Sequence, residues 1–320
     1  MSDDLSAPAG SAGPVESAVP PRPPVDRDLG PVGIWSGQFD FSSADVVREA
    51  VRELESLGYP TLWTGEAIGR EVLTAAGLML AATSSLTVAT GIAQVHARNA
   101  LTMAAGHLAL SEAYPDRFVL GVGISHKLLM DVRGVAYRTP LTQMRAYLDE
   151  MDRTSGIYRA VAPSSSVRML AALGPKMLDL ARERADGAHT YFVPPEHTAD
   201  ARAALGPGKI LAPEQAFVLD ANPSSARALA RRHTTSYLRL PNYTNNLRRY
   251  GFTDDDFADG GSDRLVDTIV AWGDADALLS RIKEHRAAGA DHVCVQVLDE
   301  NRTGLPRRQW RELAPALLGR

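Results

Sequence analysis

The feature of this sequence that most limits its fold is a regular alternation of short apolar runs with helical segments. Eight runs have the length and the β-branched or aromatic content of buried strands. They cover residues 31–35, 59–63, 86–91, 117–122, 167–171, 186–190, 210–219 and 292–298. Strands that alternate with helices pair in parallel, and eight such units can close into a barrel of about 250 residues. The sequence therefore predicts an α/β fold of the (β/α)8 TIM-barrel type.

The helical segments carry the apolar face that this fold requires. Residues 43–57 place Val46, Val47, Ala50, Val51, Leu54 and Leu57 on one side, and Gly58 follows as a helix stop. An open doubly wound sheet has the same periodicity. However, no G-x-G-x-x-G motif follows the first predicted strand, which argues against a dinucleotide site in an open sheet.

The chain of 320 residues is longer than a minimal barrel, and we expect an insertion after the seventh strand. Residues 241–262 interrupt the alternation there with asparagines, tyrosines and an acidic run. Such a segment is either a surface excursion or a lid over the barrel mouth, and we favour a partial lid.

Residues 1–29 hold six prolines among alanine, serine and glycine. This composition cannot form a packed core, so we expect a disordered tail followed by one barrel domain at residues 30–320. The tail lacks the basic start and apolar region of a signal peptide, and no later apolar stretch reaches the ~18 residues that span a bilayer. We therefore expect a cytoplasmic protein with no membrane partner.

The charges and the metal-ligating residues exclude several classes of function. Acidic and basic residues are interspersed around a net charge of −4, which gives no basic groove for a nucleic acid. Cys294 is the only cysteine, so disulfides are excluded, and its apolar surroundings predict a thiol buried in a strand. The histidine spacings match no metal-binding motif, and we expect no metal.

Two consecutive predicted strands end in glycine, which is the strongest indication of a ligand site. The first ends at Thr90-Gly91-Ile92, and the second ends at Gly121-Val122-Gly123. Because glycine has no side chain, a flat molecule can approach the backbone closely at such positions. The pattern favours a flavin-like cofactor.

Four segments resemble, in the same order, the luciferase-like superfamily of TIM barrels and especially its coenzyme F420-dependent oxidoreductases. The segments are residues 57–63, 90–99, 114–123 and 172–187. The resemblance extends over roughly residues 30–320. It implies a luciferase-like barrel that binds a deazaflavin, acts on a small molecule and commonly forms a homodimer.

The resemblance also implies which residues contact the cofactor. They are Trp63, Thr90, Gly91, Ile92, Gly121, Gly123, Leu173, Gly174, Pro175, Lys176 and Met177. In such proteins the residue pair after the third strand forms a non-prolyl cis peptide bond that supports the cofactor ring, and by position this pair is Gly91-Ile92.

A helix that begins at Gly174-Pro175 would offer its first N–H groups to the phosphate of F420 or FMN. Lys176 either adds charge to that site or is merely solvated. Trp35 and Trp63, at the ends of the first two strands, either form apolar walls near the ring or fill the barrel core.

Three residues are candidates for moving a proton. His126 follows the strand that ends at Gly123, and His96 follows the Gly91-Ile92 pair. An imidazole titrates near neutral pH, so either histidine could exchange the proton that accompanies hydride transfer. Glu66 stands where related enzymes often carry an Asp-His pair, and it could move a proton or form an ion pair with Arg70.

The sequence supports three functional hypotheses. The first is an F420-dependent oxidoreductase that transfers a hydride between the deazaflavin C5 and a small organic substrate. The second keeps the fold but uses FMN, as a monooxygenase that receives reduced flavin from a partner reductase. The third is a deazaflavin-binding protein without catalytic activity.

Overall fold

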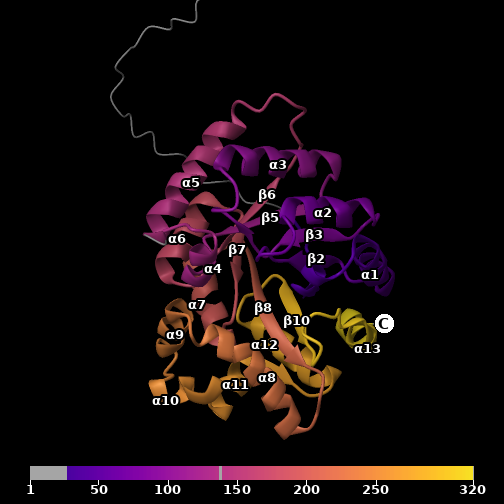
Figure 1. Cartoon of the computed structure of the whole chain (residues 1–320), viewed down its shortest axis with the longest axis vertical. Coiled ribbons are helices and arrows are strands. Elements are labelled where there is room, and N and C mark those ends of the chain that lie inside the picture. The colour runs from indigo at the N-terminus through magenta and orange to yellow at the C-terminus, as the bar shows by residue number, and fades with distance from the viewer. Residues whose placement is uncertain (1–26, 137–138, 320) are drawn as a thin grey trace, which may run out of the picture.

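The computed structural model describes residues 27–136 and 139–319, and in it the predicted strands form a closed parallel barrel (Figure 1). The eight strands of the ring are β1 (Val32–Trp35), β2 (Thr61–Thr64), β3 (Thr87–Thr90), β5 (Phe118–Gly123), β6 (Val167–Ala171), β7 (Gly187–Thr190), β8 (Ile210–Val218) and β10 (Val293–Leu298). β10 pairs in parallel with both β1 and β8, which closes the ring. The TIM-barrel prediction is confirmed, and all carboxyl ends meet at one rim.

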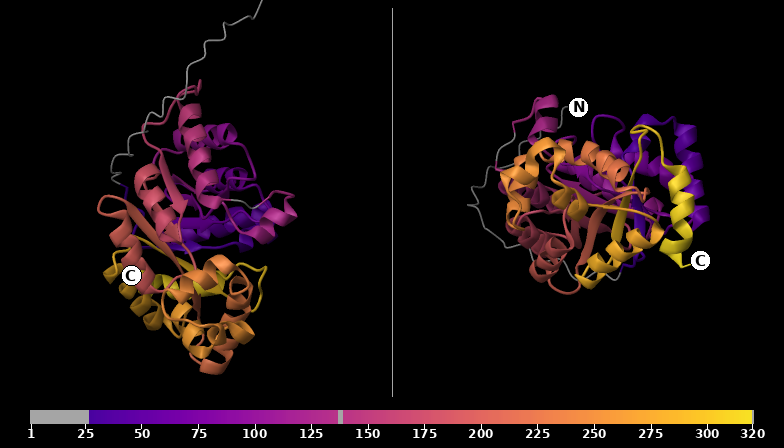
Figure 2. Two further views of the ribbon diagram at one scale, coloured as in Figure 1. Left: turned by 90° about the vertical axis from the view of Figure 1, so that its left-hand side faces the viewer. Right: turned by 90° about the horizontal axis from the view of Figure 1, so that it is seen from below.

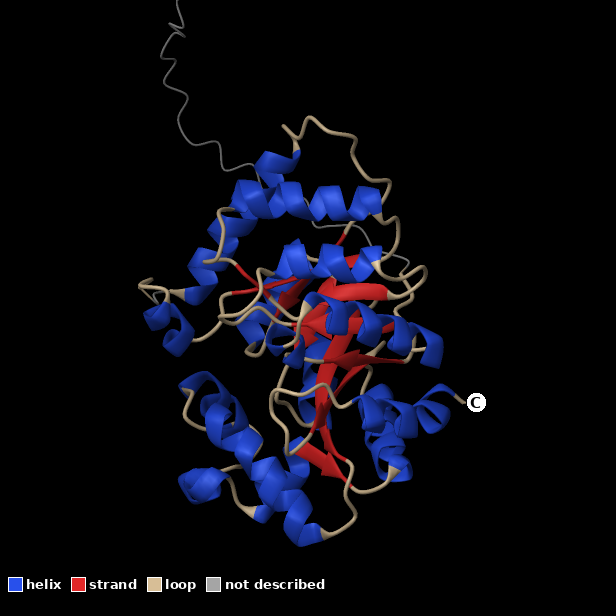
Figure 3. Ribbon diagram, turned by 45° about the vertical axis from the view of Figure 1, so that its right-hand side comes forward, coloured by secondary structure: helices blue, strands red, loops and turns tan. Residues whose placement is uncertain are grey.

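The helices surround the strands, as Figure 3 shows. They are α1 (Ala44–Leu57), α2 (Val72–Ala81), α3 (Ala100–Ala113), α4 (Lys127–Val132), α5 (Pro140–Ser155), α6 (Pro175–Arg184), α7 (Pro195–Leu205), α8 (Pro223–Tyr237), α9 (Pro241–Arg248), α10 (Asp254–Phe257), α11 (Asp263–Ile269), α12 (Ala275–Ala287) and α13 (Arg307–Leu318), with 3-10 turns η1 (Gln38–Phe41) and η2 (Ala258–Gly260). None of the helices in the described ranges is long and apolar enough to cross a bilayer.

Helix α1 shows how local sequence sets these boundaries. The Ser43 side chain accepts a hydrogen bond from the Val46 N–H at the start of the helix, and Gly58 ends it in the left-handed conformation with φ of 88°. Val47, Ala50, Val51 and Leu54 are buried as predicted. Val46, which the sequence analysis placed on the apolar face, is instead 39% exposed. The predicted apolar face was therefore too wide.

The first and last α-helices of the described ranges, α1 and α13, lie side by side in Figure 2. Arg307 and Arg311 of α13 both form ion pairs with Glu53 of α1. The last helix therefore packs against the first.

Two short strands were not predicted, because each has too few residues to show a period. β4 (Ala93–Gln94) pairs with β5, and β9 (Val270–Trp272) pairs with the second half of β8, beyond the point where β7 ends. The predicted insertion, residues 241–262, contains α9, α10 and η2, and it follows the seventh strand of the ring as expected.

Part of the barrel interior is filled by an apolar cluster. Trp63, Ala89, Met169, Ala212 and the thiol of Cys294 belong to one buried cluster, and the predicted burial of Cys294 is confirmed. Leu29 belongs to the same cluster, and the Thr61 hydroxyl donates to its carbonyl oxygen at 2.7 Å. Residues 27–29, which the sequence analysis assigned to the tail, thus pack against the barrel. The rest of the predicted tail lies outside the described residues.

The two glycines of β5, Gly121 and Gly123, leave space that atoms of Thr90 and Ile92 occupy. The Thr90 hydroxyl donates to the Gly121 carbonyl oxygen at 2.7 Å and accepts from the Gly121 N–H at 2.9 Å. A Cβ atom on Gly121 would lie 2.1 Å from the Thr90 carbonyl oxygen, and one on Gly123 would lie 2.9 Å from the Ile92 side chain. These glycines therefore allow β3 and β5 to approach each other.

We expect the Gly121→Ala variant to lose about 3 kcal/mol of unfolding free energy, because its methyl group would collide with backbone and not with a movable side chain. Gly174→Ala is the matched control, since no atom lies within 4 Å of a Cβ at that position. Urea unfolding of both variants measures the difference. Equal stability of the two variants would contradict this account of Gly121.

Candidate active site

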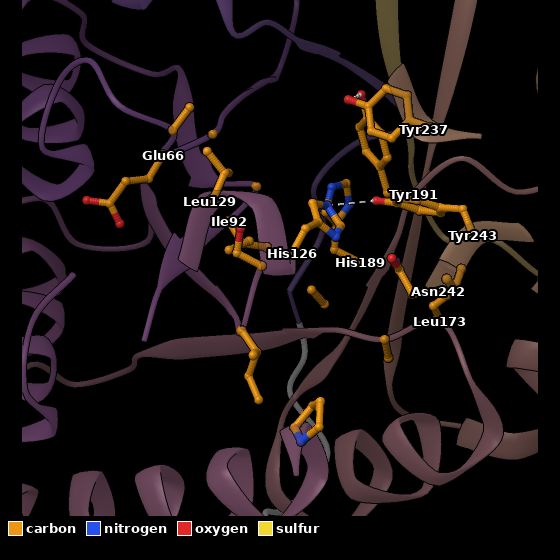
Figure 4. Close-up of a pocket in the computed structure, with 18 of the residues that line it drawn as sticks. Glu66, Ile92, His126, Leu129, Leu173, His189, Tyr191, Tyr237, Asn242 and Tyr243 are labelled. Carbon is orange, nitrogen blue, oxygen red and sulfur yellow. Dashed lines mark hydrogen bonds between the residues drawn. The ribbon is translucent and has the colours of Figure 1, made fainter. Parts of the chain in front are cut away.

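A cavity of about 840 Å³ opens at the carboxyl-end rim of the barrel, in the size range of sites for cofactors and small molecules (Figure 4). It is lined by residues that follow β1, β2, β3, β5, β6 and β7 and by residues of α9. The insertion therefore forms part of the cavity wall, which agrees with the partial lid that the sequence analysis favoured.

The structure brings several predicted site residues to this cavity but not all of them. Glu66, Gly91, Ile92, His126, Leu173, Gly174, Pro175 and Met177 line it. The residues that do not line it are Trp63, Thr90, Gly121, Gly123, Lys176 and His96.

The chain turns sharply between β3 and β4, at a segment that we call the corner, residues 90–94. The peptide bond between Gly91 and Ile92 is cis, as predicted. The Trp35 indole N–H donates to the Gly91 carbonyl oxygen at 3.1 Å, and the Gly91 N–H donates to the Thr64 carbonyl oxygen at 2.8 Å. The corner thus presents a fixed stretch of backbone to the cavity.

Glu66 supports the corner from the neighbouring loop. The Gln94 N–H donates to its carboxylate at 2.7 Å, and the Glu66 N–H donates to the Ile92 carbonyl oxygen at 3.1 Å. Its ion-pair partner is Arg98, not Arg70 as the sequence analysis suggested. Arg70 instead donates to the carbonyl oxygens of residues 39 and 42. The charge and hydrogen bonds of Glu66 are therefore used to hold this part of the chain.

The two candidate histidines differ in position. His126 lies at the cavity wall, where its Nε2 is 3.4 Å from the Tyr243 hydroxyl oxygen. Burial lowers the pKa of His126, so its ring is neutral at neutral pH. His96 lies outside the cavity wall, and both burial and the charge of Arg133 lower its pKa. Of these two histidines, only His126 is placed to contact a molecule in the cavity.

The tryptophans at the ends of the first two strands also differ in position. Trp35 lines the cavity. Trp63 fills the core instead, because its indole N–H donates to His292 Nε2 at 3.0 Å and its ring stacks on His189 with centroids 4.7 Å apart. Its predicted contact with a cofactor is therefore replaced by packing inside the barrel.

The start of α6 forms another side of the cavity. Gly174 precedes the helix, Pro175 is its first residue, and no side chain caps its N–H groups. The loop is held from behind, because His197 Nε2 donates to the Leu173 carbonyl oxygen at 2.7 Å. Lys176 is exposed and is not part of the lining, which favours the solvated alternative.

Sequence reasoning missed an aromatic wall that is assembled from three elements. Tyr191 follows β7, Tyr237 ends α8, and Tyr243 belongs to α9. The Tyr191 and Tyr237 hydroxyl oxygens lie 2.8 Å apart, and Tyr191 also donates to Gln296 at 2.7 Å. His189 lies on the same side, at the end of β7 (Figure 4). In the sequence, a sign of this part of the site was His189, which lies near the end of the predicted strand at residues 186–190.

Glu214 lies close to this wall, in the middle of β8, and is 2% exposed. The Phe192 N–H donates to one of its carboxyl oxygens at 3.2 Å, while the other has no hydrogen-bond partner among the described residues. Burial raises the pKa of Glu214 to about 8. The barrel interior is therefore uncharged at this point at neutral pH.

Because burial raises the pKa of Glu214, we predict that this residue makes the stability of the protein depend on pH. Between about pH 4.5 and pH 8 the folded protein keeps a proton on Glu214 that the unfolded chain has lost, so this residue lowers stability increasingly as the pH rises. Glu214→Gln should therefore gain unfolding free energy over the natural protein, by up to about 1.4 kcal/mol for each pH unit between pH 5 and pH 8.

Urea unfolding at several pH values measures this gain. The control is Glu55→Gln, because hydrogen bonds from the backbone of residues 84–86 hold the pKa of Glu55 below its usual value. That variant should lose stability to the same extent throughout the range. A gain for Glu214→Gln that does not change with pH would contradict a protonated carboxyl in the folded barrel.

The described ranges contain no group of three or more histidine, cysteine or acidic side chains that could hold a metal ion.

Two curated proteins are similar to part of this chain. A 5,10-methylenetetrahydromethanopterin reductase from Methanolobus tindarius is 28% identical over 149 residues, which are 42% of this chain and 46% of the relative. A Mycobacterium tuberculosis protein, provisionally named a coenzyme F420-dependent oxidoreductase, is 26% identical over 194 residues, 51% of this chain and 55% of the relative. The matches thus span about half the length of each relative.

Solved structures share the fold over most of the chain. An F420-dependent secondary alcohol dehydrogenase has a TM-score of 0.71 at 14% identity, with 89% of this chain and 98% of that chain covered. The coenzyme F420-dependent tetrahydromethanopterin reductase of Methanopyrus kandleri has a TM-score of 0.70 at 17% identity, with coverage of 89% and 97%. An FMN complex of the oxygenating constituent of 3,6-diketocamphane monooxygenase from Pseudomonas putida has a TM-score of 0.65 at 13% identity, with coverage of 88% and 95%.

The sequence model of the luciferase-like monooxygenase family matches residues 30–292, which is most of the chain. Seven of the eight ring strands, the corner after β3 and the residues that line the cavity lie within that range. The chain therefore belongs to the luciferase-like monooxygenase family.

Proposed function

We propose that the protein is an F420-dependent oxidoreductase that transfers a hydride between the deazaflavin C5 and a small organic substrate. The observation that carries this proposal is the corner at Gly91 and Ile92, which lines a cavity large enough for a flat tricyclic ring. One of the curated relatives bears a name that refers to coenzyme F420, which supports the deazaflavin over FMN. A homodimer is part of the proposal on the family resemblance alone.

The residues present fit such a cofactor at both of its ends. Gly91 exposes backbone to the cavity, and a Cβ there would lie 2.8 Å from the Trp35 indole nitrogen, so only glycine leaves this surface flat. The space around Gly174 is open for 4 Å, and the uncapped N–H groups of α6 favour an anion such as the phosphodiester of F420.

Each residue of the site then has a defined task. When bound, F420 accepts or donates a hydride at its C5 carbon. Gly91 and Ile92 would support one face of the ring, and Trp35 would exclude water beside it. His126 would exchange the accompanying proton, because its neutral ring lies at the cavity wall and its Nδ1 has no hydrogen-bond partner in the described part of the chain.

Titration of the purified protein with F420 and with FMN tests the choice of cofactor. We expect F420 to change the tryptophan fluorescence at micromolar concentrations, because Trp35 lies in the cavity wall. FMN should bind more weakly. Tighter binding of FMN, together with oxygen consumption when reduced FMN is supplied, would contradict the proposal and support a monooxygenase.

A second prediction concerns the proton. His126→Gln should lower kcat about 100-fold with a substrate that the natural protein turns over, because general acid or base catalysis by a side chain contributes at least that factor. The matched control is His96→Gln, since His96 does not line the cavity and should not change kcat. Full turnover by His126→Gln would show that another group moves the proton.

A further inference from the structure

The inner end of the cavity contains a histidine with one hydrogen-bonded and one unpartnered ring nitrogen. His189 lines the cavity and is only 2% exposed. Its Nδ1 lies 2.7 Å from the carbonyl oxygen of Ala212. A carbonyl oxygen can only accept, so Nδ1 carries the proton and Nε2 presents a lone pair. No group in the described ranges donates a hydrogen bond to this Nε2.

His292 provides an internal comparison, because it lies in the same barrel with the same arrangement. Its Nδ1 donates to the Gly30 carbonyl oxygen at 2.8 Å, and its Nε2 accepts from the Trp63 indole N–H at 3.0 Å. Burial lowers the pKa of both histidines to about 4, so both rings are neutral. The protein satisfies the acceptor of His292 but not that of His189, and a buried acceptor without a partner is costly.

The polar groups around His189 are already committed elsewhere. Gln296 accepts from the Tyr191 hydroxyl at 2.7 Å, and Tyr237 must then donate to Tyr191, since the Tyr191 proton is used. The Trp35 indole N–H donates to the corner at Gly91. The donor for His189 must therefore come from a molecule in the cavity.

The walls around this end of the cavity are aromatic. Trp35 and Tyr191 lie with ring centroids 5.5 Å apart, and Tyr237 and Tyr243 lie 5.2 Å apart. Rings of this kind bind another ring by stacking and edge contacts. An aromatic or cyclic ligand therefore suits this space.

The charged residues of the lining do not favour an ionic ligand. Glu66 is paired with Arg98, and Arg249 lies 3.8 Å from Asp200. The third charged lining residue, Asp40, accepts from the Arg70 N–H at 3.2 Å. A ligand at the inner end would therefore meet neutral groups, which favours an uncharged molecule.

We propose that the inner end of the cavity binds an uncharged, ring-containing substrate through its hydroxyl group, and that His189 Nε2 accepts the hydrogen bond from that hydroxyl. This inference rests on the proposed function, because it assigns the substrate side of the same cavity. His189 is a specificity-determining residue in this assignment, and His126 keeps the task of exchanging the proton.

Phenol and anisole are matched probes, because they share a ring and differ in the hydroxyl proton. We expect phenol to bind the natural protein about tenfold more tightly than anisole, the factor that corresponds to one buried neutral hydrogen bond. Nitrogen NMR of the eight histidines gives a second readout. Phenol should shift the unprotonated Nε2 signal of His189, and anisole should not. The signal is assigned by its absence in His189→Asn.

The variants separate the acceptor from the rest of the ring. Asn at position 189 can still donate to the Ala212 carbonyl oxygen but has no acceptor at the Nε2 position, so it should lose the preference for phenol. Gln can place its amide oxygen near that position and should restore part of the preference. His292→Asn is the control, since the Nε2 of His292 is occupied by Trp63, and it should keep the preference.

The outcomes distinguish this inference from the proposed function. Equal affinity for phenol and anisole in the natural protein, which needs no variant, would overturn the hydroxyl assignment. Loss of F420 affinity in His189→Asn with an unchanged phenol preference would also overturn it, because the donor would then belong to the cofactor. Failure of F420 to bind the natural protein would contradict the proposed function, while the comparison of phenol with anisole would still test His189.

Discussion

The hydrogen bonds that hold the corner after β3 are the constraint on which the site depends. Gly91 and Ile92 lie between β3 and β4, outside the pairing of either strand with β5, so their backbone groups need other partners. Trp35 of β1 and Glu66, which follows β2, supply them. Arg98 in turn neutralises the Glu66 carboxylate. The cavity floor is therefore backbone fixed by three neighbouring strand ends, which can position a ring without the entropy cost of ordering mobile side chains.

The barrel interior combines an apolar cluster around Trp63 with buried polar groups. His189 stacks on Trp63, and Glu214 lies in register with Cys294 of the same cluster. Burial keeps both groups uncharged at neutral pH, since it lowers the pKa of the histidine and raises that of the carboxyl. Groups held neutral in this way orient a ligand by hydrogen bonds. In the proposed function, proton exchange is assigned to His126, which is half-buried near the rim.

The strands and the insertion could be predicted because each depends on a short stretch of sequence, whereas the cis bond at Gly91 was expected from the family resemblance. The partners across the barrel could not. Whether Trp35 or Trp63 reaches the cavity depends on the stagger of the strands, which apolar periodicity does not encode. Glu66 pairs with Arg98 across two loops, although Arg70 is nearer in sequence. The tyrosine wall combines three elements that only the closed barrel brings together, so no local motif marks it.

The similarity to solved structures separates what the fold provides from what this chain adds. Barrels that share its architecture at 13–17% identity include proteins with F420 and a protein with FMN. The architecture alone therefore does not choose the cofactor or the substrate. Side chains at the strand ends must make that choice, because they are the part of the barrel that meets the ligand. In this chain His189 lies in β7, Tyr191 follows it, and α9 brings Tyr243 against Tyr191, so we propose that these side chains, which lie away from Glu66, select the substrate.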